Sequence, residues 1–182
     1  PTRTFGSISG GSALKYAVYP DGKTGSWMGR NPSNYPVPIT LEEAITIARR
    51  HREQLMQGVE ILAELPANAD DEQYKLTQQR LIQNAPDVND TMWGHKYFSL
   101  LFPDKLDDFH VAYFQRFHLV KLLQPNIPEE RAGRYIAAGR FVEAASELEM
   151  PMNHLTTILN VHNGRPYHYW SVLASDPRNP DA

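Results

Sequence analysis

The sequence predicts a mainly α-helical protein with a small β component: an N-terminal β-hairpin, a helical bundle and a C-terminal helix-turn-helix or winged-helix-like unit. Three observations predict this class. From Thr40 onward, apolar residues recur at spacings of three and four, the period of an amphipathic helix. Before residue 30, two strand-like segments flank a cluster of turn residues. Residues 141–159 have the spacing of two helices joined by a tight turn.

The length of 182 residues suits a single domain with short appendages. We expect a flexible lead-in and the hairpin in residues 1–38 and the helical domain in residues 39–173. The helix-turn-helix-like unit would occupy residues 141–173, and residues 174–182 would form a disordered tail. The chain begins at Pro1 rather than Met, which suggests an excised domain or a processed chain.

Composition excludes several classes of protein. A net charge of −3 argues against a protein that coats nucleic acid nonspecifically, because that function needs a large positive field. The chain has no cysteine, so disulfides, thiolate zinc sites and thiol nucleophiles are excluded. No apolar run is long enough to span a bilayer, so we expect no membrane association.

The stretch AVYPDGKTG, residues 17–25, fits both a relaxed phosphate-loop pattern and a β-hairpin. Pro20 lies inside the would-be loop and has no N–H to give to a phosphate. The glycines and Pro32 that follow Thr24 disfavour the helix that a phosphate loop requires. We therefore interpret the stretch as a hairpin, with strands ALKYAV and SWMG and a turn at Pro20, Asp21 and Gly22.

A long helix is predicted to begin at Thr40, because Thr40 and Glu43 form a capping box, and to end before Pro66. Its apolar residues recur along one face. The positions expected to face the core are Leu41, Ile45, Ala48, Leu55, Val59 and Leu62.

Further helices are predicted from residue 70 or 71 to 84, from residue 89 or 90 to Pro103, and over residues 108–123. Pro128 is expected to open a fifth helix. The inward residues would be Tyr74 and Leu81 in the first of these, Trp93, Tyr97, Leu100 and Leu101 in the next, and Phe109, Tyr113, Phe117 and Val120 in the third.

The segment FVEAASELEMPMNHLTTIL, residues 141–159, predicts the helix-turn-helix-like unit. Ala145 is the small residue at which two helices can cross closely. Leu148, Leu155 and Ile158 are expected to face inward, and Met150 to pack under the turn. Glu149 stands where the turn usually has glycine, so we expect a turn that is strained or slightly different in shape.

The second helix of this unit would present hydrogen-bonding side chains suited to DNA bases and phosphates. Residues 152–170 contain no Asp or Glu, and the sequence RPYHYWSVL after Gly164 suggests a wing strand. Its aromatic residues Tyr167, Tyr169 and Trp170 are interpreted as packing rather than base-stacking residues. A purely structural helix pair stays an open alternative. The candidate DNA-binding residues are Asn153, His154, Thr156, Thr157, Asn160, Arg165 and His168.

Other polar residues receive a structural interpretation. Asp104, Asp107 and Asp108 in PDKLDDFH fit turn and helix-cap chemistry better than a metal site. His110 and His118 are interpreted as partly buried, hydrogen-bonding histidines. No Ser-His-Asp set has a nucleophile elbow. We therefore expect no enzymatic activity, no metal and no cofactor.

Four segments between residues 93 and 170 form a distinctive set: WGHKYFSLLFPDKLDDFH, YFQRFHLVKLL, GRFVEAASELEMPMNHLTTILN and NGRPYHYW. The set resembles the N-terminal or adaptor region of McrB-like proteins of modification-dependent restriction systems. The most distinctive pieces are Lys96-Tyr97, Phe102-Pro103-Asp104-Lys105 and Gln115-Arg116.

In that family, such a region precedes a nucleotide-hydrolysing AAA+ motor, which recruits a separate nuclease. The region often recognises modified DNA. The motor motifs are absent from this sequence. The resemblance implies a non-catalytic DNA-recognition module of a cytoplasmic, prokaryotic restriction or anti-phage defence system. Its partners would be double-stranded DNA, plain or modified, and AAA+ motor and nuclease subunits.

A protein–protein adaptor that links a motor ATPase or GTPase to other subunits is the alternative. In that case the helix-turn-helix-like unit is a structural prop. The long helix over residues 40–65 would present the partner surface, with Arg49, Arg50 and Arg52 facing an acidic protein.

Overall fold

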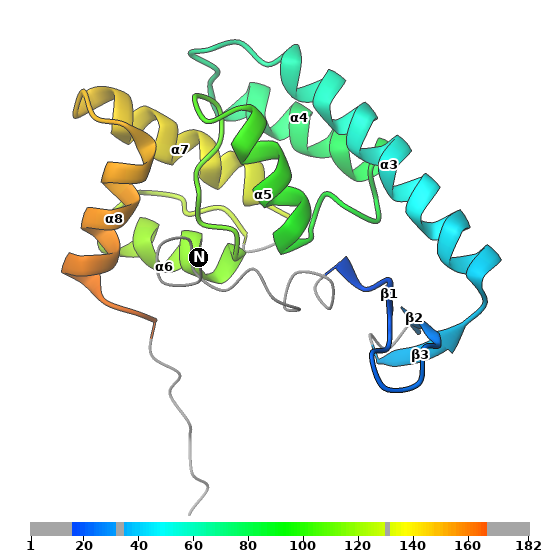
Figure 1. Cartoon of the computed structure of the whole chain (residues 1–182). Coiled ribbons are helices and arrows are strands. Elements are labelled where there is room, and N and C mark those ends of the chain that lie inside the picture. The colour runs from blue at the N-terminus through cyan, green and yellow to red at the C-terminus, as the bar shows by residue number, and fades with distance from the viewer. Residues whose placement is uncertain (1–15, 32–34, 130–131, 167–182) are drawn as a thin grey trace, which may run out of the picture.

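The computed structural model describes residues 16–31, 35–129 and 132–166. As predicted, the fold is mainly helical, with a small antiparallel sheet at the N-terminal end (Figure 1). The sheet lies beside the start of the long helix α3, and the other helices extend from one flank of α3 to the opposite side of the molecule (Figure 1). The helices are α3 (Leu41–Ala63), α4 (Asp71–Asn84), α5 (Met92–Leu101), α6 (Ala112–Lys121), α7 (Arg134–Glu147) and α8 (Met152–Asn163).

The sheet contains the predicted hairpin and a third strand. Its order is β1 (Tyr19–Pro20), β2 (Trp27–Arg30) and β3 (Pro36–Ile39), and each neighbouring pair is antiparallel. The first strand is shorter than expected. Tyr16, which precedes it, is helical, and Ala17 lies in a turn with a φ of 72°. The rest of the expected strand, residues 13–15, lies outside the described residues.

The hairpin turn leaves no site for a phosphate. The Asp21 carboxylate accepts hydrogen bonds from the backbone N–H groups of Lys23 (2.7 Å) and Thr24 (3.2 Å). A negatively charged group of the chain therefore already uses the donors that a phosphate loop would offer.

The start of α3 is as predicted. The Thr40 hydroxyl accepts from the Glu43 N–H (3.2 Å), and the Glu43 carboxylate accepts from the Thr40 N–H (2.7 Å). The predicted inward stripe is only partly correct. Leu62 is buried, and Leu55 and Val59 pack against the core, but Leu41 and Ile45 are exposed.

Two residues that are not large and apolar, Gln54 and Gly58, are buried on the side of α3 that faces the core. An added Cβ at Gly58 would lie 2.3 Å from Cζ of Phe98, so only glycine lets this ring pack against the helix. The Gln54 side-chain amide donates to the Asp87 carboxylate and accepts from the Asp87 N–H, both at 2.8 Å. A fully paired amide is inexpensive to bury, and this pairing rotates α3 away from its purely apolar face.

The prediction for α4 is confirmed both in the bounds of the helix and in its buried residues Tyr74 and Leu81. It crosses α7 at Gly139, where an added Cβ would lie 2.4 Å from Cδ2 of Tyr74. The Tyr74 hydroxyl donates to the Lys105 carbonyl (2.8 Å). The main core around this crossing consists of Ile61, Leu62, Leu65, Tyr74, Leu81, Ala85, Val88, Phe98, Leu106, Tyr135 and Ala138.

The predicted inward faces of α5 and α6 are only partly correct: Trp93 packs against the core and Phe109 is buried. Residues Tyr97, Leu100 and Leu101 of α5 are exposed, and so is Val120 of α6. Both helices bury polar residues that bond to each other or to their surroundings. The buried residues are Gly94, His95, Phe98 and Ser99 in α5, and Ala112, Gln115, His118 and Leu119 in α6.

Helix α7 begins later than predicted. Its N-cap is Gly133, and Pro128 lies outside the helix, where its carbonyl accepts from the Arg116 guanidinium (3.0 Å). The residues around Gly133 are tightly packed, since an added Cβ would lie 2.4 Å from Cβ of Pro128. Among the described residues, no helix combines the length and the apolar character needed to cross a membrane.

Candidate nucleic-acid interface

Residues 148–151 connect α7 to α8 in a Schellman turn. The Met150 N–H donates to the Ala145 carbonyl and the Glu149 N–H to the Ser146 carbonyl, both at 3.0 Å. Glu149 has a φ of 50°, in the left-handed region that favours glycine. The predicted strain at Glu149 is therefore confirmed.

Helix α8 packs through one stripe against the second core of the protein. Leu155 and Leu159 are buried there, as is Ala145 of α7, the predicted crossing residue. Met150 packs against the same cluster from under the turn, as expected. The buried members of this core are Phe109, Leu119, Ala137, Phe141, Ala145, Leu155 and Leu159.

Five of the predicted site residues are exposed, and they come from α8 and the residues just after it. They are Asn153, His154, Thr157, Asn160 and Arg165. His168, Tyr167, Tyr169, Trp170 and most of the predicted wing strand lie outside the described residues.

The prediction that Thr156 contacts DNA is wrong, because this side chain is only 2% exposed and does not face solvent. Ile158, predicted to face inward, is instead 51% exposed. At about 100° per residue, the two side chains flank the Leu155–Leu159 stripe at similar angles. The helix turns the threonine inward, where its hydroxyl donates to the Met152 carbonyl (3.2 Å) and needs no water. Leu148, also predicted to face inward, is 57% exposed at the turn.

Helix α6 lies beside α8 and is joined to it by polar contacts. His118 of α6 is buried and stacks on Phe109, with ring centroids 4.5 Å apart. The Asn163 side-chain nitrogen lies 3.2 Å from Nδ1 of His118, which accepts while the imidazole is neutral. Burial lowers the pKa of His118, although the Asn160 side chain acts in the opposite direction. The ring is therefore a neutral connector between the two helices.

The α6–α8 pair, meaning these two packed helices, differs in charge from the rest of the chain. The chain carries 21 acidic residues, but none of them occurs in residues 109–128 or 152–166. Arg116 and Lys121 are exposed on α6, and Arg165 is exposed after α8. A chain with a net charge of −3 thus has two neighbouring helices without a carboxylate (Figure 1).

A buried polar cluster lies under the start of α6. The Asp107 carboxylate accepts from the Gln115 side chain and from the Phe109 N–H, both at 2.6 Å. His95 Nε2 lies 3.6 Å from the same carboxylate. The Arg134 guanidinium donates to the carbonyls of Thr91 (3.0 Å) and His110 (2.6 Å). These bonds fix α5, α6 and α7 relative to one another.

Burial changes the titration of this cluster. It raises the pKa of Asp107 to about 7, while the bonds from Gln115 and Phe109 act in the opposite direction. Burial, and then the positive charge of Arg134 and the ring of His110, lower the pKa of His95 well below its ordinary value. Both groups therefore favour their neutral forms, which a buried site requires.

The cluster corrects part of the sequence interpretation. Asp107 makes the local turn bond that was expected of it, to the Phe109 N–H, but its carboxylate is also buried and accepts from Gln115 of α6. Asp108 is not the cap of α6, because Val111 holds that position without a side-chain bond. Among the described residues, no group of three or more His, Asp or Glu is arranged to hold a metal ion.

Comparison of the chain with protein-family models, curated proteins and solved structures finds no match.

Proposed function

We propose that the chain is a DNA-recognition module that contacts duplex DNA through the α6–α8 pair. The observation that carries the proposal is the absence of carboxylates from two packed helices in an acidic chain. DNA presents a dense row of phosphates, so a contact surface must lack negative charge even where its positive charge is modest.

Roles follow from side-chain chemistry. Arg165 and Lys121 suit phosphate contacts, which position the protein without reading sequence. Asn153 and Asn160 suit base edges, since an amide both donates and accepts hydrogen bonds.

The orientation of α8 on the duplex is limited by charge. Glu147 and Glu149 are exposed just before α8 and would repel phosphates near the start of the helix. The C-terminal half of α8 is therefore the part that approaches the backbone. Exposed Val161 in that half suits an apolar contact such as a thymine methyl group.

The resemblance to McrB-like proteins supports the same proposal. It suggests modified duplex DNA as the target, AAA+ motor and nuclease subunits as partners, and the bacterial or archaeal cytoplasm as the location. The helix-turn-helix or winged-helix identity of the C-terminal unit is part of this proposal.

The test is fluorescence anisotropy of labelled duplexes, plain and base-modified, at low and near-physiological salt. We expect roughly micromolar binding at low salt that weakens steeply as salt rises. Lys121→Ala with Arg165→Ala should weaken binding to every duplex and reduce the salt slope by about 1 for each lost phosphate contact. Asn153→Ala should change the preference among duplexes more than the salt slope.

The matched control is Arg49→Ala with Arg52→Ala, which removes the same charge from the exposed side of α3. Equal weakening by the two double variants would mean that only net charge matters, and the proposed surface would be wrong. Flat titrations for all duplexes at low salt would eliminate the DNA function itself.

The adaptor alternative assigns its partner surface to Arg49, Arg50 and Arg52 of α3. Arg50 of α3 already has an acidic partner within the chain, because its guanidinium pairs with the Asp87 carboxylate at 2.6 Å. A different surface, an acidic groove along α7, supports a protein partner.

A further inference from the structure

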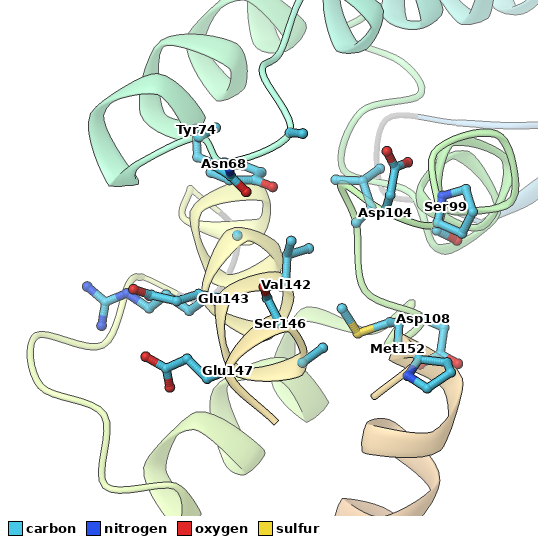
Figure 2. A pocket seen from close by; sticks show the side chains of 18 of the residues that line it. Asn68, Tyr74, Ser99, Asp104, Asp108, Val142, Glu143, Ser146, Glu147 and Met152 are labelled. Carbon is cyan, nitrogen blue, oxygen red and sulfur yellow. The ribbon is translucent and has the colours of Figure 1, made fainter. Parts of the chain in front are cut away.

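A groove with a volume of about 1390 Å³ runs along α7. Its other walls are the N-terminal ends of α4 and α8 and parts of residues 99–110. Figure 2 shows Val142 and Ser146 of α7 on the side that faces Asp104 and Met152. Small-molecule sites usually measure roughly 300–1,000 Å³. The groove is therefore large enough for several side chains of a peptide segment.

Part of the groove surface is apolar and adaptable. Methionine side chains reach it from the α7–α8 turn and from the start of α8, and flexible thioethers suit docking surfaces that accept varied side chains. The apolar lining residues include Tyr74, Leu106, Val142, Ala145, Met150 and Met152.

The polar part of the groove is acidic. Only one lining residue, Arg140, is an arginine or lysine, and it is already paired with the Asp71 carboxylate at 2.7 Å. Asp104, Asp108 and Glu147 form no ion pair within the described part of the chain. The six lining carboxylates are Asp70, Asp71, Asp104, Asp108, Glu143 and Glu147.

The carboxylates are spread along the groove rather than gathered at one point. Asp104 and Asp108 lie across from α7, whereas Glu143 and Glu147 project from the opposite edge of that helix (Figure 2). This spacing does not fit a metal ion, which needs converging ligands. It fits several cationic groups held apart on one chain.

We propose that the groove docks a segment of a partner protein that carries lysine or arginine side chains interspersed with apolar ones. Apolar side chains fill the floor, and the cations meet the carboxylates on both edges. The phosphate backbone of DNA has the wrong sign for this surface. The groove and the proposed DNA surface share Asn153 at the start of α8, but the exposed cations Arg116, Lys121 and Arg165 do not line the groove.

The experiment uses a fluorescein-labelled synthetic peptide of alternating lysine and leucine as the probe. Its anisotropy is measured with the full chain, beside a glutamate–leucine peptide as the charge-reversed control. We expect saturable binding of the lysine peptide alone. Amide chemical-shift changes should fall in residues 99–110 and 139–153.

Two pairs of variants localise the binding. Ser146→Lys places a cation in the groove, at an exposed helix position that accepts lysine, and should abolish binding, whereas Ser146→Ala should leave it unchanged. Asp104→Asn with Asp108→Asn should raise the Kd by roughly three- to thirtyfold. Glu53→Gln with Glu60→Gln removes the same charge from the exposed side of α3 and should have little effect.

Several outcomes would overturn the proposal. One is equal weakening by both charge-neutralising pairs, which would mean nonspecific attraction. A second is unchanged binding in Ser146→Lys. A third is that, without peptide, Ser146→Lys shifts amides in residues 1–15 or 167–182, since the chain itself would then occupy the groove. Loss of a dimer in that variant would assign the groove to a second copy, and displacement of the peptide by plain duplex DNA would assign it to nucleic acid.

Discussion

Glu149 is held at a φ of 50° by the Schellman turn between α7 and α8. A Cβ in this conformation costs about 1–2 kcal/mol, whereas glycine adopts it freely. We expect Glu149→Gly to raise the free energy of unfolding by about 0.5–1 kcal/mol, after the greater freedom of glycine in the unfolded chain is subtracted. Urea unfolding followed by circular dichroism measures the change.

Glu149→Ala separates backbone strain from charge. It removes the carboxylate but keeps the Cβ, so no comparable gain is expected. If the alanine variant gained as much stability as the glycine variant, the strain explanation would be refuted.

At position 139, unlike position 149, the chain already has the glycine that the structure requires, because the Tyr74 ring occupies the space beside Gly139. An added Cβ would lie 2.4 Å from that ring, and the ring is held by its hydrogen bond to the Lys105 carbonyl. We expect Gly139→Ala to lower the free energy of unfolding by about 1–3 kcal/mol, the usual cost of overpacking a core. Gly22→Ala is the matched control, since an added Cβ there meets nothing within 4 Å. Equal effects of the two substitutions in urea unfolding would contradict this account.

At the level of elements, local signals in the sequence predicted helix starts well where a capping box exists. Thr40 and Asp70 both form capping boxes, and α3 and α4 begin directly after them. Helix α7 has no side-chain cap at its start, and its predicted start at Pro128 was wrong. Proline permits a helix to begin but does not require it, and here packing around Gly133 decides.

The faces of α5 and α6 were not predictable from apolar spacing. His95, Gln115 and His118 are fully or almost fully buried, because each finds polar neighbours on another segment. Apolar periodicity assigns such residues to solvent, since the partner that makes burial affordable is remote in sequence. For the same reason, the sequence did not indicate that α6 belongs to the candidate site. The charge pattern of residues 109–128 is visible in the sequence, but its contact with α8 is not.

At the scale of the whole molecule, buried histidines set the pH dependence of stability. The pKa values of His51, His95, His110 and His118 are lowered from 6.5, mainly by burial. Below pH 6.5 the unfolded chain therefore binds more protons than the folded chain. We expect the free energy of unfolding to rise as the pH is raised from about 5 to 6.5. Urea titrations at several pH values measure this slope.

Asp107 acts in the opposite direction. Its pKa is raised from 3.8 to about 7, so between these values the folded chain keeps a proton that the unfolded chain has lost, and stability falls as the pH rises. Because four histidines act in one direction and one carboxyl group in the other, we expect the net slope to stay positive. Asp107→Asn removes the opposing group, so its slope should be steeper than that of the unchanged protein. An unchanged slope in the variant would show that Asp107 is ionised in the folded state throughout this range.

The difference in charge between the carboxylate-free α6–α8 pair and the acidic groove along α7 has a kinetic consequence. Charges so arranged give the molecule an electric dipole that the net value of −3 does not reveal. In the field of a polyanion, such a molecule rotates before contact, and one orientation dominates the encounters. An association rate governed by that torque depends on where the charges sit rather than on their sum, so a weakly acidic protein can approach a duplex already correctly turned.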